Sequence, residues 1–139
     1  MYINAISLYR IYSKKIFIKY KLSGILEAIN YLIFNSSIPA TATIGNGTFC
    51  SHRGMSVVIH KKAIIGRNTI IGTCVTLGGR GKDIEGAPTI GDNCYIATGA
   101  KILGPVTIGN NVVIGANSVV LSNVEDNSTV VGIPARRIS

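Results

Sequence analysis

The chain has 139 residues and a formal net charge of +8, although only 14% of its residues are charged. This length accommodates one domain with a short appendage. No apolar run approaches the roughly 18 residues of a membrane span, and basic residues interrupt the only stretch that resembles a signal peptide. Three cysteines (Cys50, Cys74 and Cys94) form no CxxC pair, and their odd number argues against a secreted disulfide framework. We therefore expect a protein of the reducing cytoplasm.

Residues 1–34 differ in composition from the rest of the chain, because they are rich in Tyr, Ile and Lys and contain no proline. Apolar residues at helical spacing predict two short helices, over residues 3–19 and 23–34. We expect residues 1–35 to cap the open end of the following domain, which would otherwise expose unpaired backbone. Contact of the basic residues 1–21 with an anionic membrane surface is the alternative, and the two roles are compatible.

The second domain, residues 36–139, repeats every six residues. The repeat begins near Ile38, slips across residues 49–56, and is strongest over residues 89–124. One position of each six is aliphatic in that stretch: Ile90, Ile96, Ile102, Ile108, Ile114 and Val120. An α-helix would carry a six-residue repeat around its surface, whereas a flat strand would repeat every two residues. The period therefore favours neither of these elements alone.

A six-residue period fits short strands separated by corners, with three strands in each triangular turn of a parallel β-helix. The aliphatic residue of each six then points inward and stacks on its equivalent 18 residues later, about 4.7–4.9 Å away. Burial of each such side chain is worth about 1.5–3 kcal/mol. At the corners, Asn and Asp are expected to adopt unusual φ angles and to bond their own backbone. Cys74 and Cys94 are expected to be small packing residues.

Residues 78–88 interrupt the repeat. Ile90 follows Leu77 by thirteen residues rather than six, so seven extra residues must project from the coil as a loop. Loops on a rigid scaffold often carry recognition. We therefore expect loop 78–88 to cover a functional site.

Three segments, GTCVTLGGRGK, APTIGDNCYIATGAKILGPVTIGNNVVIGANSVVL and STVVGIPAR, resemble the hexapeptide-repeat acyltransferases, in the branch of the serine acetyltransferases and of short sugar or polysaccharide O-acetyltransferases. The six-residue spacing does not determine the hand of the coil, and parallel crossovers are right-handed in about 98% of cases. The left-handed coil expected here is therefore implied by the resemblance alone. The resemblance also implies a homotrimer that binds acetyl-CoA, its co-substrate, between neighbouring subunits. In this branch a histidine near the start of the coil is the general base, and His52 in SHRGM occupies that position. Imidazole suits that role, which typically contributes 10²–10⁴-fold.

The same resemblance suggests residues for binding. Three small residues match the family's contacts with CoA, five basic residues are candidates to neutralise its phosphates, and three polar residues are candidates to contact the acceptor. In that order they are Gly79, Thr98 and Ala116; Arg80, Lys82, Lys101, Arg136 and Arg137; and His60, Asp83 and Glu85.

Two departures from serine acetyltransferases bear on the acceptor. Ser37 or its neighbour stands where those enzymes carry an Asp that orients the base, which leaves Ser51, a backbone carbonyl or an acidic residue of the loop to do so. Gly86 and Ala87 stand where they carry an Arg-His pair that grips serine. We therefore expect O-acetylation of a sugar or polysaccharide precursor, supplied as a small molecule or on a lipid. Serine O-acetylation, N-acetylation of an amino sugar and a non-catalytic scaffold are the alternatives.

The positive charge does not indicate nucleic-acid binding, because no aromatic–basic interleaving or known module accompanies it. Five of the fourteen basic residues fall within residues 10–21. The charge suits CoA phosphates, an acidic glycan or a membrane-bound precursor, so the inner face of the membrane is the alternative location. No metal is expected, since a zinc carbonic anhydrase of this fold needs three histidines and the chain has two.

Overall fold

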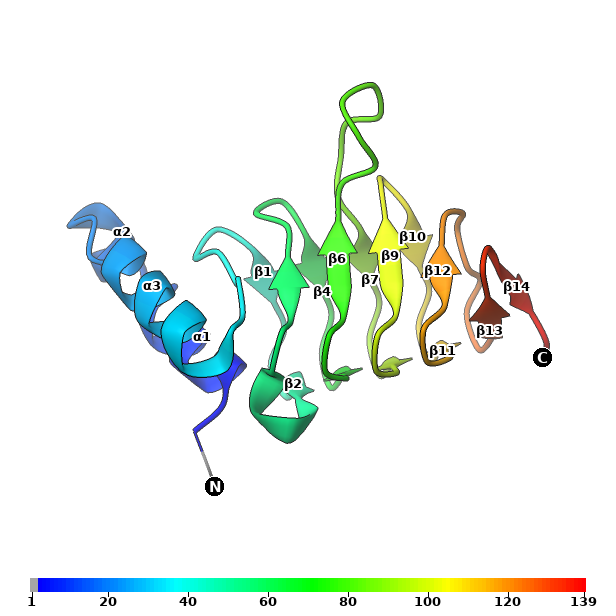
Figure 1. The fold of residues 1–139 in the computed structure, drawn as a ribbon, viewed down its shortest axis with the longest axis horizontal. Coiled ribbons are helices and arrows are strands. Elements are labelled where there is room, and N and C mark those ends of the chain that lie inside the picture. The colour runs from blue at the N-terminus through cyan, green and yellow to red at the C-terminus, as the bar shows by residue number, and fades with distance from the viewer. Residues whose placement is uncertain (1–2) are drawn as a thin grey trace.

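The computed structural model describes residues 3–139, which form a triangular prism of stacked coils with helices at one end (Figure 1). The helices are α1 (Ala5–Tyr12), α2 (Lys15–Lys19) and α3 (Ser23–Phe34). The single helix expected over residues 3–19 is wrong, because Lys14 is extended (φ −64°, ψ 140°) and separates two helices. Four residues of α1 are buried and none of α2 is, so the chain turns away from the coils once α1 has docked. The helix expected over residues 23–34 is confirmed.

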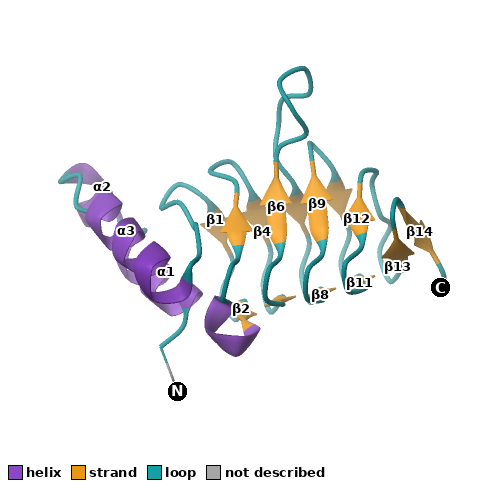
Figure 2. Ribbon diagram, in the orientation of Figure 1, coloured by secondary structure: helices purple, strands orange, loops and turns teal. Residues whose placement is uncertain are grey.

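The strands are short and lie on the three sides of the prism, with loops and turns at its corners (Figure 2). They are β1 (Thr43–Ile44), β2 (Phe49–Cys50), β3 (Val58–Ile59), β4 (Ile64–Ile65), β5 (Ile70–Ile71), β6 (Thr76–Gly78), β7 (Thr89–Ile90), β8 (Tyr95–Ile96), β9 (Lys101–Leu103), β10 (Thr107–Ile108), β11 (Val113–Ile114), β12 (Val119–Val120), β13 (Thr129–Gly132) and β14 (Ala135–Arg137). Three sheets result, in the orders β1-β4-β7-β10, β14-β13-β11-β8-β5-β2 and β12-β9-β6-β3. Their pairs are parallel except that of β13 with β14. The architecture is the predicted parallel β-helix and fits its left-handed form.

The aliphatic side chains of the repeat fill the interior of the prism. Pairing places Ile108 beside Ile90 and Ile114 beside Ile96, each 18 residues apart. Ile96 and Ile114 are both 0% exposed, whereas Tyr95 and Val113, one residue earlier on the same strands, face outward. The predicted inward stack is therefore confirmed, and it forms the dry core to which every turn contributes.

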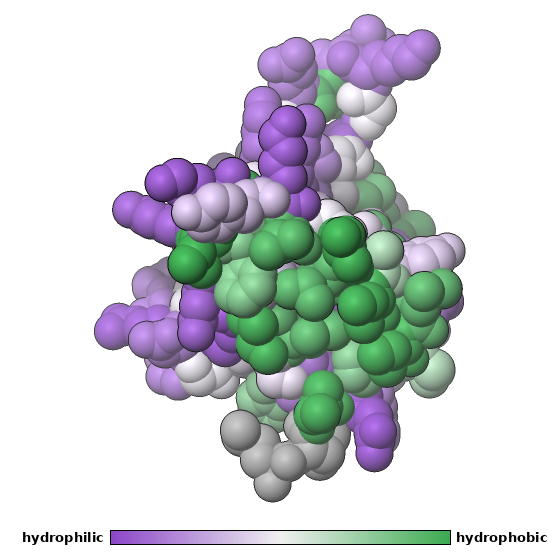
Figure 3. Space-filling view, turned by 90° about the vertical axis from the view of Figure 1, so that its left-hand side faces the viewer, coloured by the Kyte–Doolittle hydropathy of each residue, from purple (hydrophilic) through white to green (hydrophobic). Residues whose placement is uncertain are grey.

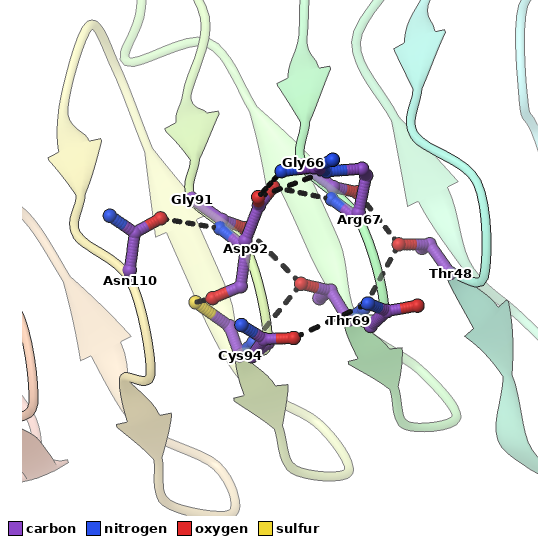
Figure 4. Close-up of polar contacts among 10 residues, drawn as sticks. Thr48, Gly66, Arg67, Thr69, Gly91, Asp92, Cys94 and Asn110 are labelled. Carbon is purple, nitrogen blue, oxygen red and sulfur yellow. Dashed lines mark hydrogen bonds and ion pairs between the residues drawn. The ribbon is translucent and has the colours of Figure 1, made fainter.

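Polar side chains join successive coils at the corner between the first and second strands of each turn (Figure 4). The Thr48 hydroxyl donates to the Gly66 carbonyl oxygen of the next coil at 2.7 Å. One carboxylate oxygen of Asp92 accepts the backbone N–H of Arg67 at 2.7 Å, and the other accepts its guanidinium at 2.8 Å. These bonds from Arg67, the backbone bond first, hold the pKa of Asp92 below its ordinary value. In turn, the Asn110 side chain accepts the backbone N–H of Asp92 at 2.8 Å.

Asparagines at the corners adopt the expected left-handed backbone, with φ of 54° at Asn68 and 57° at Asn93. The expectation that such side chains bond their own backbone is wrong. The Asn68 amide instead donates to the Asn93 side chain at 3.4 Å, because equivalent corners of adjacent coils lie side by side. Cys94 is buried, as expected of a packing residue, but Cys74 stands exposed at a corner with φ of 57°.

Helix α1 covers the open end of the first coil. Its buried Tyr12 donates its hydroxyl to the Ile38 carbonyl at 2.6 Å and accepts the Asn30 amide of α3 at 2.8 Å. The Tyr9 hydroxyl donates to the Ala42 carbonyl, and Arg10 donates to the Gly45 carbonyl at 2.8 Å. Burial raises the pKa of both tyrosines. The helix thus satisfies carbonyl groups that the coil would otherwise leave unpaired.

Replacement of Ile114 by Ala should lower the free energy of unfolding by about 2–5 kcal/mol, because it leaves a cavity in the inward stack. Its neighbour Val113 is 39% exposed, so Val113→Ala provides the matched control and should cost much less. Denaturant unfolding followed by circular dichroism measures both. Equal losses for the two variants would show that the stack does not carry the stability of the coil.

Removal of the Tyr12 hydroxyl by Tyr12→Phe should cost about 1–3 kcal/mol, because the buried Ile38 carbonyl loses its donor and the Asn30 amide loses one of its two acceptors. The exposed Tyr20 offers the same change without buried partners, and Tyr20→Phe should leave stability within about 0.5 kcal/mol of wild type. Thermal unfolding of the two variants distinguishes a docked cap from a loosely attached one.

Candidate active site

His52 lies on a 3₁₀ turn (Ser51–Gly54) that bulges from the corner between β2 and β3. The register slip predicted for residues 49–56 occurs here. His52 (φ 47°, ψ 42°) and Arg53 (φ 65°) both adopt left-handed backbone, which turns the chain outward and leaves both side chains exposed. Gly54 follows with φ of 80°, and a Cβ there would lie 2.9 Å from that of Ala5 in α1. Only glycine fits beneath the cap, so α1 and this turn are built against each other.

A shallow groove of 240 Å³ runs beside His52. It is lined by the end of α3 and by the 3₁₀ turn: Leu32, Ile33, Phe34, Asn35, Arg53 and Met55. Its apolar side comes from the helix, and its charge comes from Arg53. The groove gives the imidazole an open approach on the outer surface of the prism.

None of the expected orienters of the imidazole contacts it within residues 3–139. The Ser51 hydroxyl donates to the Ile71 carbonyl oxygen at 3.4 Å. Ser37 lies in a bridge to Val58, and its neighbour Ser36 is buried under the turn, where its hydroxyl donates to the Gly54 carbonyl and accepts the Val57 N–H at 3.1 Å. Ser36 therefore holds the backbone of the turn rather than the imidazole.

The corner that carries His52 continues along the prism as a ridge, which we call the His52 ridge: residues 51–57, 72–75, 97–100 and 115–118. Thr98 and Ala116, two of the expected CoA contacts, are exposed on it. Lys101 follows the ridge and donates from Nζ to the carbonyls of Cys74 at 2.6 Å and Gly99 at 2.9 Å. An ammonium has three donors, so one remains for an anion. The ridge thus carries mainly small residues, with the cations Arg53 on it and Lys101 beside it.

A second ridge, the loop ridge, follows the corner after the third strand of each turn: residues 60–63, 78–88 and 104–106. It holds a cavity of 300 Å³ whose lining includes His60, Lys62, Gly79, Lys82 and Glu85. His60 Nδ1 accepts the backbone N–H of Lys62 at 3.1 Å, so the neutral ring carries its proton on Nε2 and acts as a donor there. The sequence-based candidates for acceptor contact thus lie around one cavity or, for Asp83, on the same exposed loop.

The two ridges lie at opposite ends of the strands of the sheet β12-β9-β6-β3. Its strands are parallel, so their amino ends meet at the His52 ridge and their carboxyl ends at the loop ridge. Figure 1 shows the 3₁₀ turn at one edge and loop 78–88 projecting from the other. Within one chain, loop 78–88 with Asp83 and Glu85 therefore lies away from His52, and its expected role over the site stays a prediction for an assembly of several chains.

The remaining basic candidates do not form one cluster. Arg80 turns along the prism, passes over Gly104 and donates to the Leu121 carbonyl at 3.0 Å. Arg136 lies at the far end of the prism, in the lining of a 280 Å³ cavity. Arg137 lines the same cavity and pairs with Glu125 at 3.1 Å.

Three basic residues beside the histidines were not among the sequence-based candidates. Arg53 shares the groove with His52, and Lys61 and Lys62 share the cavity with His60. Their direct adjacency to the two histidines was the available signal. The six-residue period could not identify these three residues, because they lie at corners, where charged residues are common.

Comparison with known proteins bears on these features. Residues 87–122 match the family model described as bacterial transferase hexapeptide (six repeats). A serine acetyltransferase of Bacillus pumilus (strain SAFR-032) is 45% identical over 118 residues, which cover 84% of this chain and 54% of that protein.

Two solved structures are also similar. Neisseria gonorrhoeae serine acetyltransferase superposes with a TM-score of 0.89 and 37% identity, over 97% of this chain and 54% of that one. Brucella abortus serine acetyltransferase in complex with coenzyme A gives 0.87 and 36%, over 97% and 54%. The chain thus spans about half the length of these relatives. Together with the six-residue coil, these matches show that the chain carries the hexapeptide repeat of bacterial transferases and is similar to serine acetyltransferases.

Proposed function

We propose that the chain transfers an acetyl group from acetyl-CoA to a hydroxyl group, with His52 as the general base. The observation that carries the proposal is the position of His52, which stands exposed at one end of a ridge of small residues beside an open groove. The similarity to serine acetyltransferases, one of them solved with coenzyme A, supports the same chemistry. Thr98 and Ala116 leave room for the pantetheine arm of CoA. The remaining N–H donor of Lys101 can bind a phosphate of CoA.

The imidazole of His52 takes the proton of the acceptor hydroxyl as its oxygen attacks the thioester carbonyl carbon. The tetrahedral intermediate then collapses, the carbon–sulfur bond breaks, and the imidazolium returns the proton to the departing thiolate. A donor must stabilise the oxyanion in between, and the guanidinium of Arg53 and backbone N–H groups of the glycine-rich loop are the candidates. The products are an acetyl ester and free CoA.

The complete site is proposed to be assembled from two copies in a homotrimer. Within one chain, the strands of the sheet β12-β9-β6-β3 lie between His52 and the loop ridge. The loop of a neighbouring chain must therefore approach the His52 ridge to bring the base and the acceptor cavity together. Outward apolar residues on the sides of the prism support such packing, among them Phe49, Ile64 and Tyr95, which are 43%, 48% and 47% exposed. A neighbour would also supply the loop carboxylates, Asp83 and Glu85, that could orient the imidazole.

Serine is the acceptor that the relatives' names favour over the sugar expected from the sequence. The cavity of the loop ridge is compatible with an amino acid, because lysines can bind a carboxylate and Glu85 can bind an ammonium. A sugar hydroxyl is the second candidate. It is favoured by Gly86 and Ala87, which offer no side-chain donor where serine acetyltransferases carry an Arg-His pair.

Replacement of His52 by Ala should lower kcat by about 10²–10⁴-fold while the fold is retained, because an exposed base is removed. Release of CoA thiol with serine, and separately with a panel of nucleotide sugars, measures the rate and names the acceptor. Mass analysis of the product separates an ester from an amide. Lys21→Gln, an exposed change at the helical end, is the control. A rate unchanged by His52→Ala, or no turnover with any acceptor, would contradict the proposal, and the latter would favour a scaffold.

Replacement of Lys82 by Gln should raise the KM for serine about tenfold or more with little change in kcat, because a charge-assisted hydrogen bond to the carboxylate is lost from ground and transition states alike. Lys21→Gln, at the helical end, removes the same charge far from the loop and should leave KM unchanged. An unchanged KM with Lys82→Gln would argue for an uncharged acceptor.

A further inference from the structure

The helical end of the prism presents a broad apolar surface to solvent (Figure 3). It is formed by the outer sides of α2 and α3 and by the turn between them, and we call it the end face. Its large exposed residues are Ile16, Ile18, Tyr20, Leu22, Ile25, Ile29, Tyr31, Leu32 and Ile33. Of these, Ile25 is 63% and Leu32 is 79% exposed.

Packing of the core does not account for the apolar residues exposed on α3. Helix α3 buries only Asn30 and Phe34, although its sequence, SGILEAINYLIF, is apolar on nearly every side. A helix that is hydrophobic all round is ordinarily buried, and a contiguous apolar patch of many residues usually marks an interaction site. The end face is therefore a candidate interaction surface.

Positive charge accompanies the apolar residues. Lys14, Lys15, Lys19 and Lys21 are exposed on and beside α2, next to the apolar residues of the end face. The Lys19 ammonium lies 5.7 Å from the ring centroid of Tyr20, over its face. In the described residues 3–34 the only acidic side chain is Glu27, and its carboxylate accepts the backbone N–H of Ala40 at 2.7 Å. With one carboxylate against these four lysines, residues 3–34 carry a net positive charge.

We propose that the end face binds the surface of an anionic lipid bilayer. Isoleucine and leucine side chains enter the region between headgroups and acyl chains, tyrosines lie at the headgroup level, and the lysines meet anionic headgroups. A second copy of the chain is the less favourable partner, because a contact between two end faces brings two sets of lysines together. The contact is peripheral: none of the helices in residues 3–139 is long and apolar enough to cross a membrane.

Flotation of the full chain with lipid vesicles tests this proposal. We expect it to float with vesicles of phosphatidylcholine and phosphatidylglycerol, and far less with phosphatidylcholine alone or at high ionic strength. Lys14→Gln, Lys15→Gln and Lys19→Gln together should weaken binding about 100-fold, since each lysine near a charged surface contributes about fivefold. Lys61→Gln with Lys62→Gln, on the coil, is the charge control and should bind as wild type does.

The apolar part is tested with Ile16→Ser and Ile25→Ser, which replace side chains 59% and 63% exposed and so leave the fold intact. This double variant should lose flotation, whereas Ile138→Ser, 65% exposed at the opposite end, should not. Binding unaffected by Ile16→Ser and Ile25→Ser, or equal binding to neutral and anionic vesicles, would overturn the proposal. So would absent flotation together with a mass in light scattering that halves in the double variant, which would assign the end face to a second copy. Acetyl transfer plays no part in these readouts, so they stand independently of the proposed enzymatic activity.

Discussion

The inward stack of aliphatic side chains is the interaction on which the rest of the molecule depends. Each turn contributes one such side chain from each of three strands, and parallel pairing holds equivalent positions in line, as with Ile96 and Ile114. Because these residues must stay in register, every strand must end at a corner, and the corners must align into ridges. The core thus determines where polar chemistry can occur. It leaves the exposed positions of the ridges, such as His52 and Thr98, as places where side chains can vary without loss of packing.

Two of these ridges carry the candidate chemistry, and the parallel direction of the strands keeps them apart. The His52 ridge carries the proposed base and several small residues, while the loop ridge carries the cavity with His60 and Lys82. A single chain therefore holds the parts of a site without closing it. This geometry supports the proposed homotrimer, since association of neighbouring chains would bring together groups that one chain holds apart.

Much of the coil was predictable from sequence, because a six-residue period in Ile and Val reports directly on the burial that folds the chain. The slip around His52 and the loop after Leu77 were visible as breaks in that period. The break at Lys14 was not, since it depends on how far α1 can dock on the first coil. Nor was the direction of the Asn68 amide, the exposure of Cys74 or the separation of loop 78–88 from His52. Each of these depends on which of the three corners a residue occupies, and the six-residue period alone does not distinguish one corner from another.

The 18-residue turn also restricts how such a chain can change its length. Insertion of a whole turn would lengthen the prism, and deletion of one would shorten it, while every later residue kept its side. A change of six residues would preserve the inward stack but rotate all that follows by one side, so that loop 78–88 would emerge from a different edge relative to His52. The seven extra residues before Ile90 avoid that rotation, because they leave and re-enter at the same corner. The length of this loop can thus change without rotating the coil that follows, whereas a change within the coil keeps every later residue on its side only when it spans a full turn.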